Sequence, residues 1–376
     1  MSLNENTQAL TDPADSREFV ARVKLALRIK KPEQSAFTFL ENRLAIPRYI
    51  IGRNEESVAL RKLIEVDGVI DDYNTAPCDE FGTPIVRSSD LPVDAWVVNC
   101  STSISPVDVN RRLSALNIQA AIGINQIIEA AGGVLRWPWF VRDQRQSVEC
   151  NITQWAELFD SLADDESQRT LLDVVCYRLT ADAGYMQNYE VRVNDQYFEP
   201  FMNYSREVFV DAGGFDGDTT EAFCQRYPDY RSVHLFEPSA ANMQAAKLRL
   251  SAYRDIHFKQ AALSDTDGLL NFNDSLGSAS TVSDTSSGQV SACRLDDVLD
   301  GEVSFIKMDL EGWEMKALAG ASDLIQKNRS KLAIAVYHNA NDFLEVSRYV
   351  LALNPGRQVY LRHYTQGWSE TIMYFK

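Results

Sequence analysis

Long hydrophobic runs and an excess of basic residues are both missing from this sequence of 376 residues. No segment has the roughly 18 consecutive apolar residues that a membrane-spanning helix requires, and residues 1–16 lack the apolar centre of a signal peptide. Lysine and arginine total 37 against 53 aspartates and glutamates, so the formal net charge is −16. Nucleic acids and anionic membranes need an electropositive surface. The composition therefore predicts a cytoplasmic protein whose partners are small molecules, with no nucleic acid and no membrane span.

Cysteine and histidine are also scarce. The six cysteines are widely spaced and form no Cys-x-x-Cys pair, which argues against a disulfide framework or structural zinc and predicts buried free thiols. The four histidines show no His-x-x-x-His or similar spacing. We therefore predict no metal site, although a carboxylate-bound divalent ion near Asp309 stays open as an alternative.

Strand and helix patterns alternate along most of the chain, which predicts an α/β fold in more than one domain. We expect a lead and helix over 1–44, a small Rossmann-like α/β domain over 45–125, a mainly helical connector over 126–204, and a second α/β domain over 205–376. Two strands predicted at 358–362 and 371–375 have no helix between them, so they must be antiparallel. The second domain is therefore a parallel sheet with an antiparallel end.

A glycine-rich turn follows the strand predicted at 208–211 and leads into a helix. Glycine lets backbone approach a ligand closely, and a strand–turn–helix context is required for nucleotide binding. An acid at the strand end suits a cationic amino group, and a helix start favours a carboxylate; the methionine part of S-adenosylmethionine has both groups. A turn without a ligand is the alternative. The predicted binding residues are Asp211, Gly213, Gly214, Gly217, Asp218 and Thr219.

Two further segments are placed to bind the rest of such a ligand. Glu237 ends the next predicted strand and is followed by Pro238; an acid there accepts hydrogen bonds from both ribose hydroxyls. Helix capping is the alternative role for this acid. Ala262 and Leu263 follow the third predicted strand, where they would border an adenine ring. A simple turn explains these two residues nearly as well.

Candidate catalytic residues lie at the carboxyl ends of two later strands, where ligands bind in open α/β sheets. Lys307 and Asp309 end the strand predicted at 303–309, and charges there are costly unless they are used or paired. His338 ends the strand predicted at 332–337. We assign Asp309 as base or orienter, Lys307 as charge stabiliser and His338 as a further candidate. A structural Lys–Asp ion pair and a hydrogen-bonding histidine are the alternatives.

Taken together, these motifs resemble the FkbM family of methyltransferases over residues 205–350. The matching segments are Asp211-Ala-Gly-Gly-Phe-Asp-Gly-Asp-Thr219, Phe236-Glu-Pro-Ser239, Ala262-Leu-Ser-Asp265, Leu295-Asp-Asp297 and Ile306-Lys-Met-Asp-Leu-Glu-Gly-Trp-Glu314. Phe215 replaces the second glycine of the broad methyltransferase motif, as in that family, and 196–199 resembles the preface found in some bacterial members. The resemblance implies a class I methyltransferase sheet, S-adenosylmethionine as donor, and O-methylation of a sugar, glycan or natural-product hydroxyl.

Other functions remain as alternatives. An NAD-dependent oxidoreductase would need a fuller glycine pattern and would lack the antiparallel strand end. A non-catalytic nucleotide- or sugar-binding protein would not need the intact Asp211, Glu237 and Asp309. The resemblance does not cover residues 1–150, which we interpret as a substrate-recognition or assembly domain. A homo-oligomer and a loop over 277–288 that closes on the site are both left open.

Overall fold

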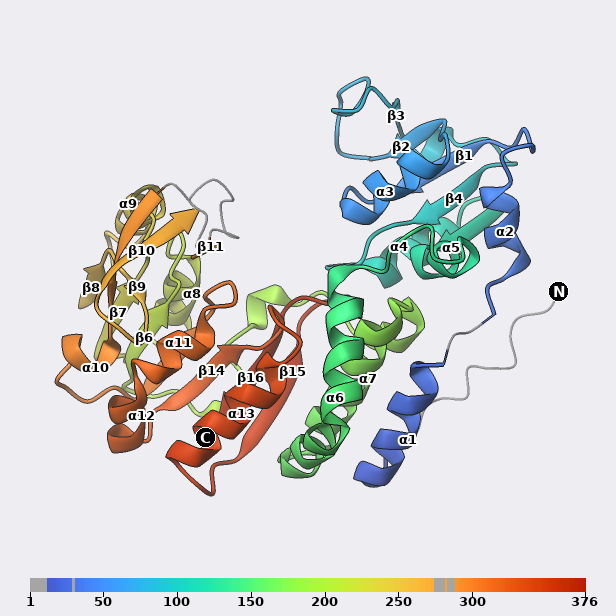
Figure 1. Cartoon of the computed structure of the whole chain (residues 1–376). Coiled ribbons are helices and arrows are strands. Elements are labelled where there is room, and N and C mark those ends of the chain that lie inside the picture. Colours follow the sequence, from blue (N-terminus) through green and yellow to red (C-terminus); the bar gives the residue numbers. More distant parts are fainter. Residues whose placement is uncertain (1–11, 29–30, 274–280, 283–287) are drawn as a thin grey trace. The chain divides into compact units, whose positions relative to one another are not determined.

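The computed structural model describes residues 12–28, 31–273, 281–282 and 288–376. The chain folds into two compact units, and both are discontinuous in sequence (Figure 1). The first unit takes residues up to 160 together with 168–193 and 363–369. The second takes 161–167, 194–362 and 370–376.

A five-stranded parallel sheet forms the centre of the first unit. Its order is β3-β2-β1-β4-β5, and every neighbouring pair is parallel. This order confirms the small Rossmann-like domain expected from the alternation of strands and helices. The strands are β1 (Arg48–Ile51), β2 (Gly68–Ile70), β3 (Ile85–Val86), β4 (Trp96–Asn99) and β5 (Ala120–Gly123).

Helices cover both faces of this sheet. Phe39, Leu60 and Ile127 pack on one face against Ile50, whereas Leu113 packs on the other. The helices of the unit are α1 (Ser16–Ala26), α2 (Gln34–Leu40), α3 (Glu55–Leu63), α4 (Pro106–Ser114), α5 (Ile124–Ala130), α6 (Trp139–Ser161) and α7 (Asp165–Thr180), with short 3₁₀ turns at Ser88–Asp90 and Ala183–Met186. Asn151 has non-helical φ and ψ and divides α6 at a kink.

The second unit is built on a seven-stranded sheet of order β15-β16-β14-β13-β6-β7-β8. The pairs from β14 to β8 are parallel, and β16 pairs antiparallel with β14, Leu332 opposite Phe375. The antiparallel end predicted from the missing crossover helix is therefore present. The strands are β6 (Val208–Ala212), β7 (Ser232–Phe236), β8 (Ile256–Lys259), β13 (Phe305–Met308), β14 (Lys331–Ala335), β15 (Val359–His363) and β16 (Thr371–Phe375).

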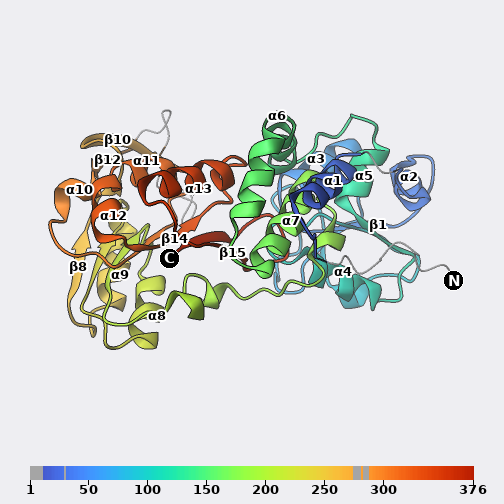
Figure 2. The ribbon, with the colours of Figure 1, turned by 90° about the horizontal axis from the view of Figure 1, so that it is seen from below.

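Figure 2 shows α8 and α9 on one face of this sheet and α11, α12 and α13 on the other. On the first face Phe223 of α8 packs against Phe209, 4.5 Å between ring centroids, and Phe209 stacks on Phe305 at 4.8 Å. These buried rings fix β6 beside β13. The helices are α8 (Asp218–Arg226), α9 (Ala240–Arg249), α10 (Leu295–Val298), α11 (Glu314–Ala319), α12 (Ser322–Asn328) and α13 (Asp342–Leu353), with 3₁₀ turns at Val193–Asp195 and Pro200–Met202.

A smaller sheet of order β11-β10-β12-β9 accompanies the large one. Its strands are β9 (Ala262–Leu263), β10 (Gly268–Asn273), β11 (Thr281–Val282) and β12 (Gly288–Cys293). In this sheet β10 pairs antiparallel with β12. Most of the loop at 277–288 lies outside the described residues, as do residues 1–11.

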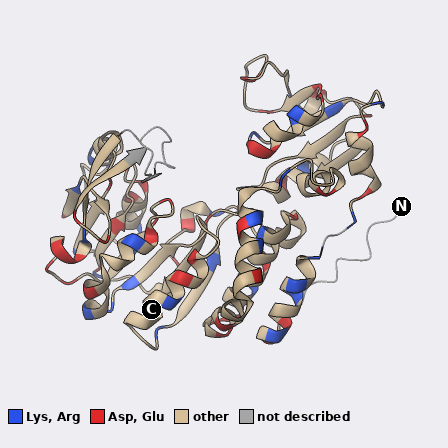
Figure 3. Cartoon of the chain, viewed as in Figure 1, with Lys and Arg blue, Asp and Glu red and all other residues tan. Residues whose placement is uncertain are grey.

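Two composition-based expectations can be compared with the structure. All six cysteines lie in described segments and are free, but Cys78 and Cys150 are exposed, so the expected burial holds for only four. Within the described segments, no helix is long and apolar enough to cross a membrane. Acidic and basic residues are scattered over the ribbon of both units (Figure 3).

Candidate functional site

The glycine-rich turn after β6 is held against the end of β7 by backbone hydrogen bonds. The amides of Gly213 and Gly214 both donate to the carbonyl oxygen of Phe236, each at 3.0 Å. A Cβ on Gly213, whose φ is +77°, would lie 2.0 Å from the carbonyl oxygen of Asp309, so only glycine fits. The turn predicted from the sequence thus lies between β6, β7 and β13.

Asp211 and Lys307 face each other on the neighbouring strands β6 and β13. Both side chains are buried, and the Lys307 Nζ lies 3.1 Å from Asp211 Oδ1. Lys307 also donates to the carbonyl oxygen of Gly213 at 2.6 Å, and Thr220 of α8 donates to Asp211 Oδ2 at 2.6 Å. The lysine therefore forms the ion pair that the sequence allowed as an alternative, and it holds the glycine-rich turn.

The charge state of this pair follows from its surroundings. Burial by itself lowers the pKa of Lys307, but the carboxylates of Asp211 and Asp309 outweigh burial and raise it overall. The ammonium therefore stays protonated at neutral pH. Asp211 has no exposed surface, so neither carboxylate oxygen faces solvent. Its carboxylate stabilises the turn through Lys307, which contacts both Asp211 and the Gly213 carbonyl oxygen.

Glu237 follows directly after β7 and is fixed by backbone amides. Its Oε2 accepts from Phe215 at 3.0 Å, and its Oε1 accepts from Ser239 at 2.9 Å. Burial raises the pKa of Glu237, while these hydrogen bonds oppose the change. Asn242 Nδ2 also donates to Oε1 at 3.3 Å. Helix capping and ligand binding are nevertheless not exclusive here, because Oε2 accepts from Phe215 alone and keeps a second lone pair. Pro238 beside it is half-buried.

The start of α8 lies at the end of the same turn. Its N-cap is Gly217, with φ of +86°, and Asp218 and Thr219 form the first turn of the helix as the sequence predicts. Glycine has no side chain with which to cap the helix, and Asp218 is exposed. The amides of Asp218 and Thr219 donate instead to the carboxylates of Asp216 and Asp218, at 3.3 and 2.6 Å. The helix start carries partial positive charge.

Ala262 and Leu263 are found on the smaller sheet, where they form β9 and pair with β12. Both side chains are buried, so the simple turn considered for them is replaced by a short strand. Ser264 follows, and its Oγ accepts from Trp313 Nε1 at 3.4 Å. This contact connects β9 to the segment between β13 and α11.

Past β13 and β14, acidic side chains surround His338. Its Nδ1 lies 3.0 Å from Glu314 Oε1, and its Nε2 lies 3.4 Å from Glu311 Oε2 and 3.6 Å from Asp309 Oδ1. Burial lowers the pKa of His338, but Glu314, Glu311 and Asp309 together raise it well above its ordinary value. The structure therefore brings Asp309 and His338 together, as expected from their places at one edge of the sheet.

Sequence reasoning missed three residues of this region. Tyr197 donates from its hydroxyl to Asp309 Oδ2 at 2.6 Å, and Glu314 lies against His338. Glu370 is half-buried and interacts electrostatically with Asp309. Burial, and then the negative charge of Asp309, raise the pKa of Glu370 to about 7. The signal for Tyr197 was its position in the 196–199 segment, and that for Glu314 was the end of the family motif. Nothing in the local sequence indicates Glu370.

Most of the residues described above lie in a segment that matches a known protein family. Residues 211–358 match a family model described as the methyltransferase FkbM domain. This matched segment is called the FkbM domain. The match supports a methyltransferase, and therefore an enzyme. No curated protein matches the chain at a significant level.

Among solved structures, the methyltransferase FkbM from Methylobacillus flagellatus KT is 23% identical, with a TM-score of 0.75 over 97% of this chain and 100% of that chain. This likeness shows that the FkbM domain and the N-terminal unit share their fold with that protein. Aeropyrum pernix fibrillarin, in complex with natively bound S-adenosyl-L-methionine, is 9% identical at a TM-score of 0.31, over 49% of this chain and 71% of that chain.

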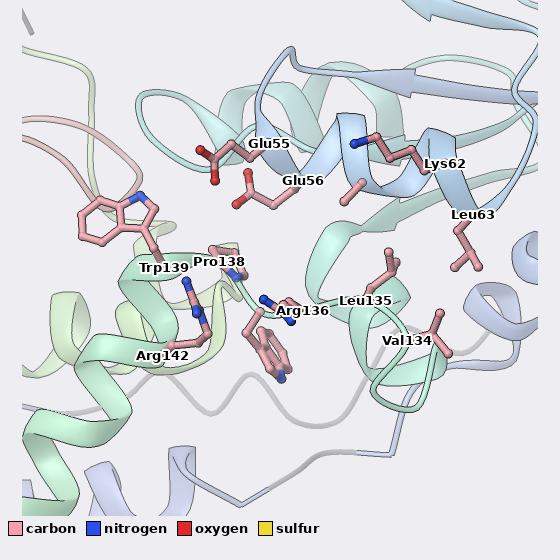
Figure 4. A pocket seen from close by; sticks show the side chains of 12 residues that line it. Glu55, Glu56, Lys62, Leu63, Val134, Leu135, Arg136, Pro138, Trp139 and Arg142 are labelled. Atoms are coloured by element: carbon pink, nitrogen blue, oxygen red, sulfur yellow. The ribbon is translucent and has the colours of Figure 1, made fainter. Parts of the chain in front are cut away.

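Outside the FkbM domain, the N-terminal unit has a pocket of about 490 Å³. Glu55 and Glu56 at the start of α3 approach it from one side, and Trp139 and Arg142 at the start of α6 from the other (Figure 4). Sequence reasoning did not identify this pocket, because its two walls are more than 70 residues apart in the chain.

Proposed function

We propose that this protein transfers a methyl group from S-adenosylmethionine to a hydroxyl of a sugar, a glycan or a natural product. The observation that carries the proposal is the convergence of the glycine-rich turn, Glu237 and Asp309 at the carboxyl ends of β6, β7 and β13. Ligands of open α/β sheets bind at this edge.

The donor fits this edge in three places. The carboxylate of Glu237 is held by backbone amides so that Oε2 keeps a lone pair for a ribose hydroxyl. The start of α8 at Asp218 and Thr219 carries the partial positive charge of a helix N-terminus, which suits the carboxylate of the methionine part. The glycine-rich turn lets backbone approach the ligand, and Asp211 with Lys307 keeps that turn in place.

The acceptor hydroxyl is a weak nucleophile, so the reaction needs a group that removes or orients its proton. The bound donor supplies an electrophilic methyl group on its sulfonium. Asp309 is the best-placed base, because its side chain is 21% exposed and Tyr197 fixes its orientation through Oδ2. His338 lies beside it and stabilises the carboxylate. Lys307 contributes by positioning, since its ammonium is already committed to Asp211 and the turn.

The pocket of the N-terminal unit suits recognition of part of the acceptor. It combines indole rings with paired carboxylates and guanidinium groups from Glu55, Glu56, Trp139 and Arg142. Aromatic faces and planar polar groups of this kind are typical of small-molecule sites that orient a polar ligand. Trp139→Ala should therefore raise KM for the acceptor while donor affinity stays unchanged.

A methyl-transfer screen tests the proposed reaction. Labelled donor is incubated with nucleotide sugars, glycans and natural-product alcohols, and any product is analysed by NMR for a new O-methyl group. We expect transfer to a hydroxyl, abolished or strongly reduced in Asp309→Asn and retained in the exposed-site control Asp300→Asn. Transfer only to nitrogen or carbon would overturn O-methylation, and full turnover by Asp309→Asn would remove Asp309 as the base. NAD-dependent oxidation of these alcohols would favour an oxidoreductase instead.

A further inference from the structure

Three side chains at the acceptor side of the FkbM domain offer one ligand atom each to a common point. Asp309, Glu314 and His338 place a carboxylate oxygen, a second carboxylate oxygen and a ring nitrogen within 4.8 Å of one another. They come from the end of β13, the first residue of α11 and the segment after β14. Parallel strands and one helix start thus bring together residues up to 29 positions apart.

Several polar atoms of this cluster have no hydrogen-bond partner among the described residues. They are Asp309 Oδ1, Glu314 Oε2 and both ring nitrogens of His338, and all four atoms are buried. The His338 side chain is only 8% exposed and that of Glu314 only 1%. Buried polar groups are rarely left unpaired, because each costs about 1–3 kcal/mol. Unpaired buried atoms on three neighbouring side chains therefore need an explanation.

Two of the three side chains are oriented by hydrogen bonds from neighbouring groups. Glu314 Oε1 accepts from the amide of Leu310 at 2.7 Å and lies 3.0 Å from His338 Nδ1. Tyr197 donates to Asp309 Oδ2 at 2.6 Å, while Oδ1 lies 3.6 Å from His338 Nε2 and has no hydrogen-bond partner among the described residues. Ligands oriented by a second set of hydrogen bonds are typical of metal sites in proteins.

A protonated His338 between carboxylates is the competing explanation. It would account for the charge, because Asp309, Glu311 and Glu314 surround a single imidazole. It would not account for the unpaired atoms, since an imidazolium at 3.0–3.6 Å should align its two N–H groups with acceptors, and neither ring nitrogen has hydrogen-bond geometry to one. A cation would instead be bound by one ring nitrogen of His338 together with one carboxylate oxygen each from Asp309 and Glu314, without such alignment.

We propose that Asp309, Glu314 and His338 bind a divalent transition-metal ion, for which Mn²⁺ and Zn²⁺ are the best-matched species. One imidazole with two carboxylates suits ions that accept both nitrogen and oxygen, whereas Mg²⁺ and Ca²⁺ prefer oxygen alone. Ligand atoms held at about 2.1 Å from one ion lie at most about 4.2 Å apart, so separations within 4.8 Å close with small side-chain movements.

Three protein ligands leave open coordination positions, as catalytic rather than structural sites do. An open position beside Asp309 suits a hydroxyl of the acceptor, whose acidity a nearby dication increases. In this respect the site deepens the proposed function and rests on it. Binding of the ion itself does not, because none of its ligands belongs to the donor-binding turn.

Manganese binding to the full-length wild-type chain, without donor or acceptor, tests the proposal. Free Mn²⁺ is followed by its electron paramagnetic resonance signal, and electron spin-echo modulation reports nitrogen coordinated to the bound ion. We expect one saturable site whose bound form shows nitrogen modulation from a single imidazole, with Zn²⁺ displacing the manganese. Absence of saturable binding by either ion would overturn the site, and so would a bound ion without nitrogen modulation.

Variants locate the ion. His338→Gln and Glu314→Gln should each weaken Mn²⁺ binding at least tenfold, whereas Asp300→Asn, which removes an exposed carboxylate, should not change it. Circular dichroism checks that each variant is folded; if one is not, the wild-type nitrogen signal still decides the question. Equal binding by folded His338→Gln and wild type would contradict the assignment. Loss of the metal site alone would leave S-adenosylhomocysteine binding intact. Failure of the metal proposal can therefore be distinguished from failure of the proposed methyl transfer.

Discussion

At the end of β7, the carboxylate of Glu237 is both a partner of backbone amides and the proposed ribose ligand. Glu237→Gln keeps the size of the side chain but replaces an acceptor oxygen with a donor NH₂ group. Hydrogen bonds to charged groups contribute about 1.5–3 kcal/mol, so we expect affinity for S-adenosylhomocysteine to fall by roughly 10- to 100-fold. Titration calorimetry measures this, with Asp300→Asn as the control. Unchanged affinity in the folded variant would remove Glu237 from the donor site.

Gly213 allows a second test at the level of one residue. Ala at this position would place Cβ 2.0 Å from the carbonyl oxygen of Asp309, at a φ of +77°. Gly356 is a matched control, because its φ is +84° but no atom lies within 4 Å of an added Cβ. Gly356→Ala isolates the backbone cost of about 1 kcal/mol, and Gly213→Ala adds about 1–3 kcal/mol for the steric clash. Urea unfolding compares the two, and equal losses of stability would contradict the close packing of the turn.

Between elements, the buried Asp211–Lys307 pair connects β6 to β13. Lys307→Met leaves Asp211 buried without its counter-charge, which should destabilise the FkbM domain by about 3–5 kcal/mol. Adding Asp211→Asn removes that charge and should restore much of the loss, because Asn still accepts from Thr220. A double-mutant cycle in urea gives the coupling energy. Additive effects would show that the two side chains do not act as a pair.

How much of these elements the sequence predicts depends on the range of the interactions that form them. The strands and helices around the glycine-rich turn follow from local alternation, turn residues and a helix start, so β6, α8, β7 and β13 lie where the pattern places them. The location of the site at one edge of the sheet can be predicted as well, because the carboxyl ends of neighbouring parallel strands lie at the same edge. Tyr197 reaching Asp309, and Glu314 reaching His338, are tertiary contacts that local periodicity cannot specify. The β9 strand depends on pairing with β12, about 30 residues later.

For the molecule as a whole, the first unit has its own dependence on pH. Burial raises the pKa of Asp173 on α7 to about 7, from an ordinary value of 3.8. Between these two pH values the native state keeps the proton while the unfolded chain releases it. The stabilisation from this protonated carboxyl is therefore complete below pH 3.8 and is lost as the pH rises toward about 7. Burial, and then Arg178 and Arg192, lower the pKa of His363 to about 3, so stability is also lost as the pH falls from 6.5 toward about 3.

Asp173→Asn should remove the loss on the alkaline side, because Asn carries no titrating proton and still accepts from Tyr189, whose hydroxyl lies 3.2 Å from Asp173 Oδ2. We expect the variant to be more stable than the wild type at pH 8 and similar at pH 4. Thermal unfolding across this range measures the difference, and His363→Gln serves as the comparison that should alter only the acid side. A parallel pH profile for wild type and Asp173→Asn would contradict a proton held at Asp173.

The central claim is that the carboxyl edge of β6, β7 and β13 binds S-adenosylmethionine. Titration calorimetry of the full chain with S-adenosylhomocysteine, followed by the same titration with NAD, tests it most directly. The claim predicts saturable one-to-one binding of S-adenosylhomocysteine that an excess of NAD does not displace. No measurable binding of S-adenosylhomocysteine, or binding of NAD at the same site, would contradict it.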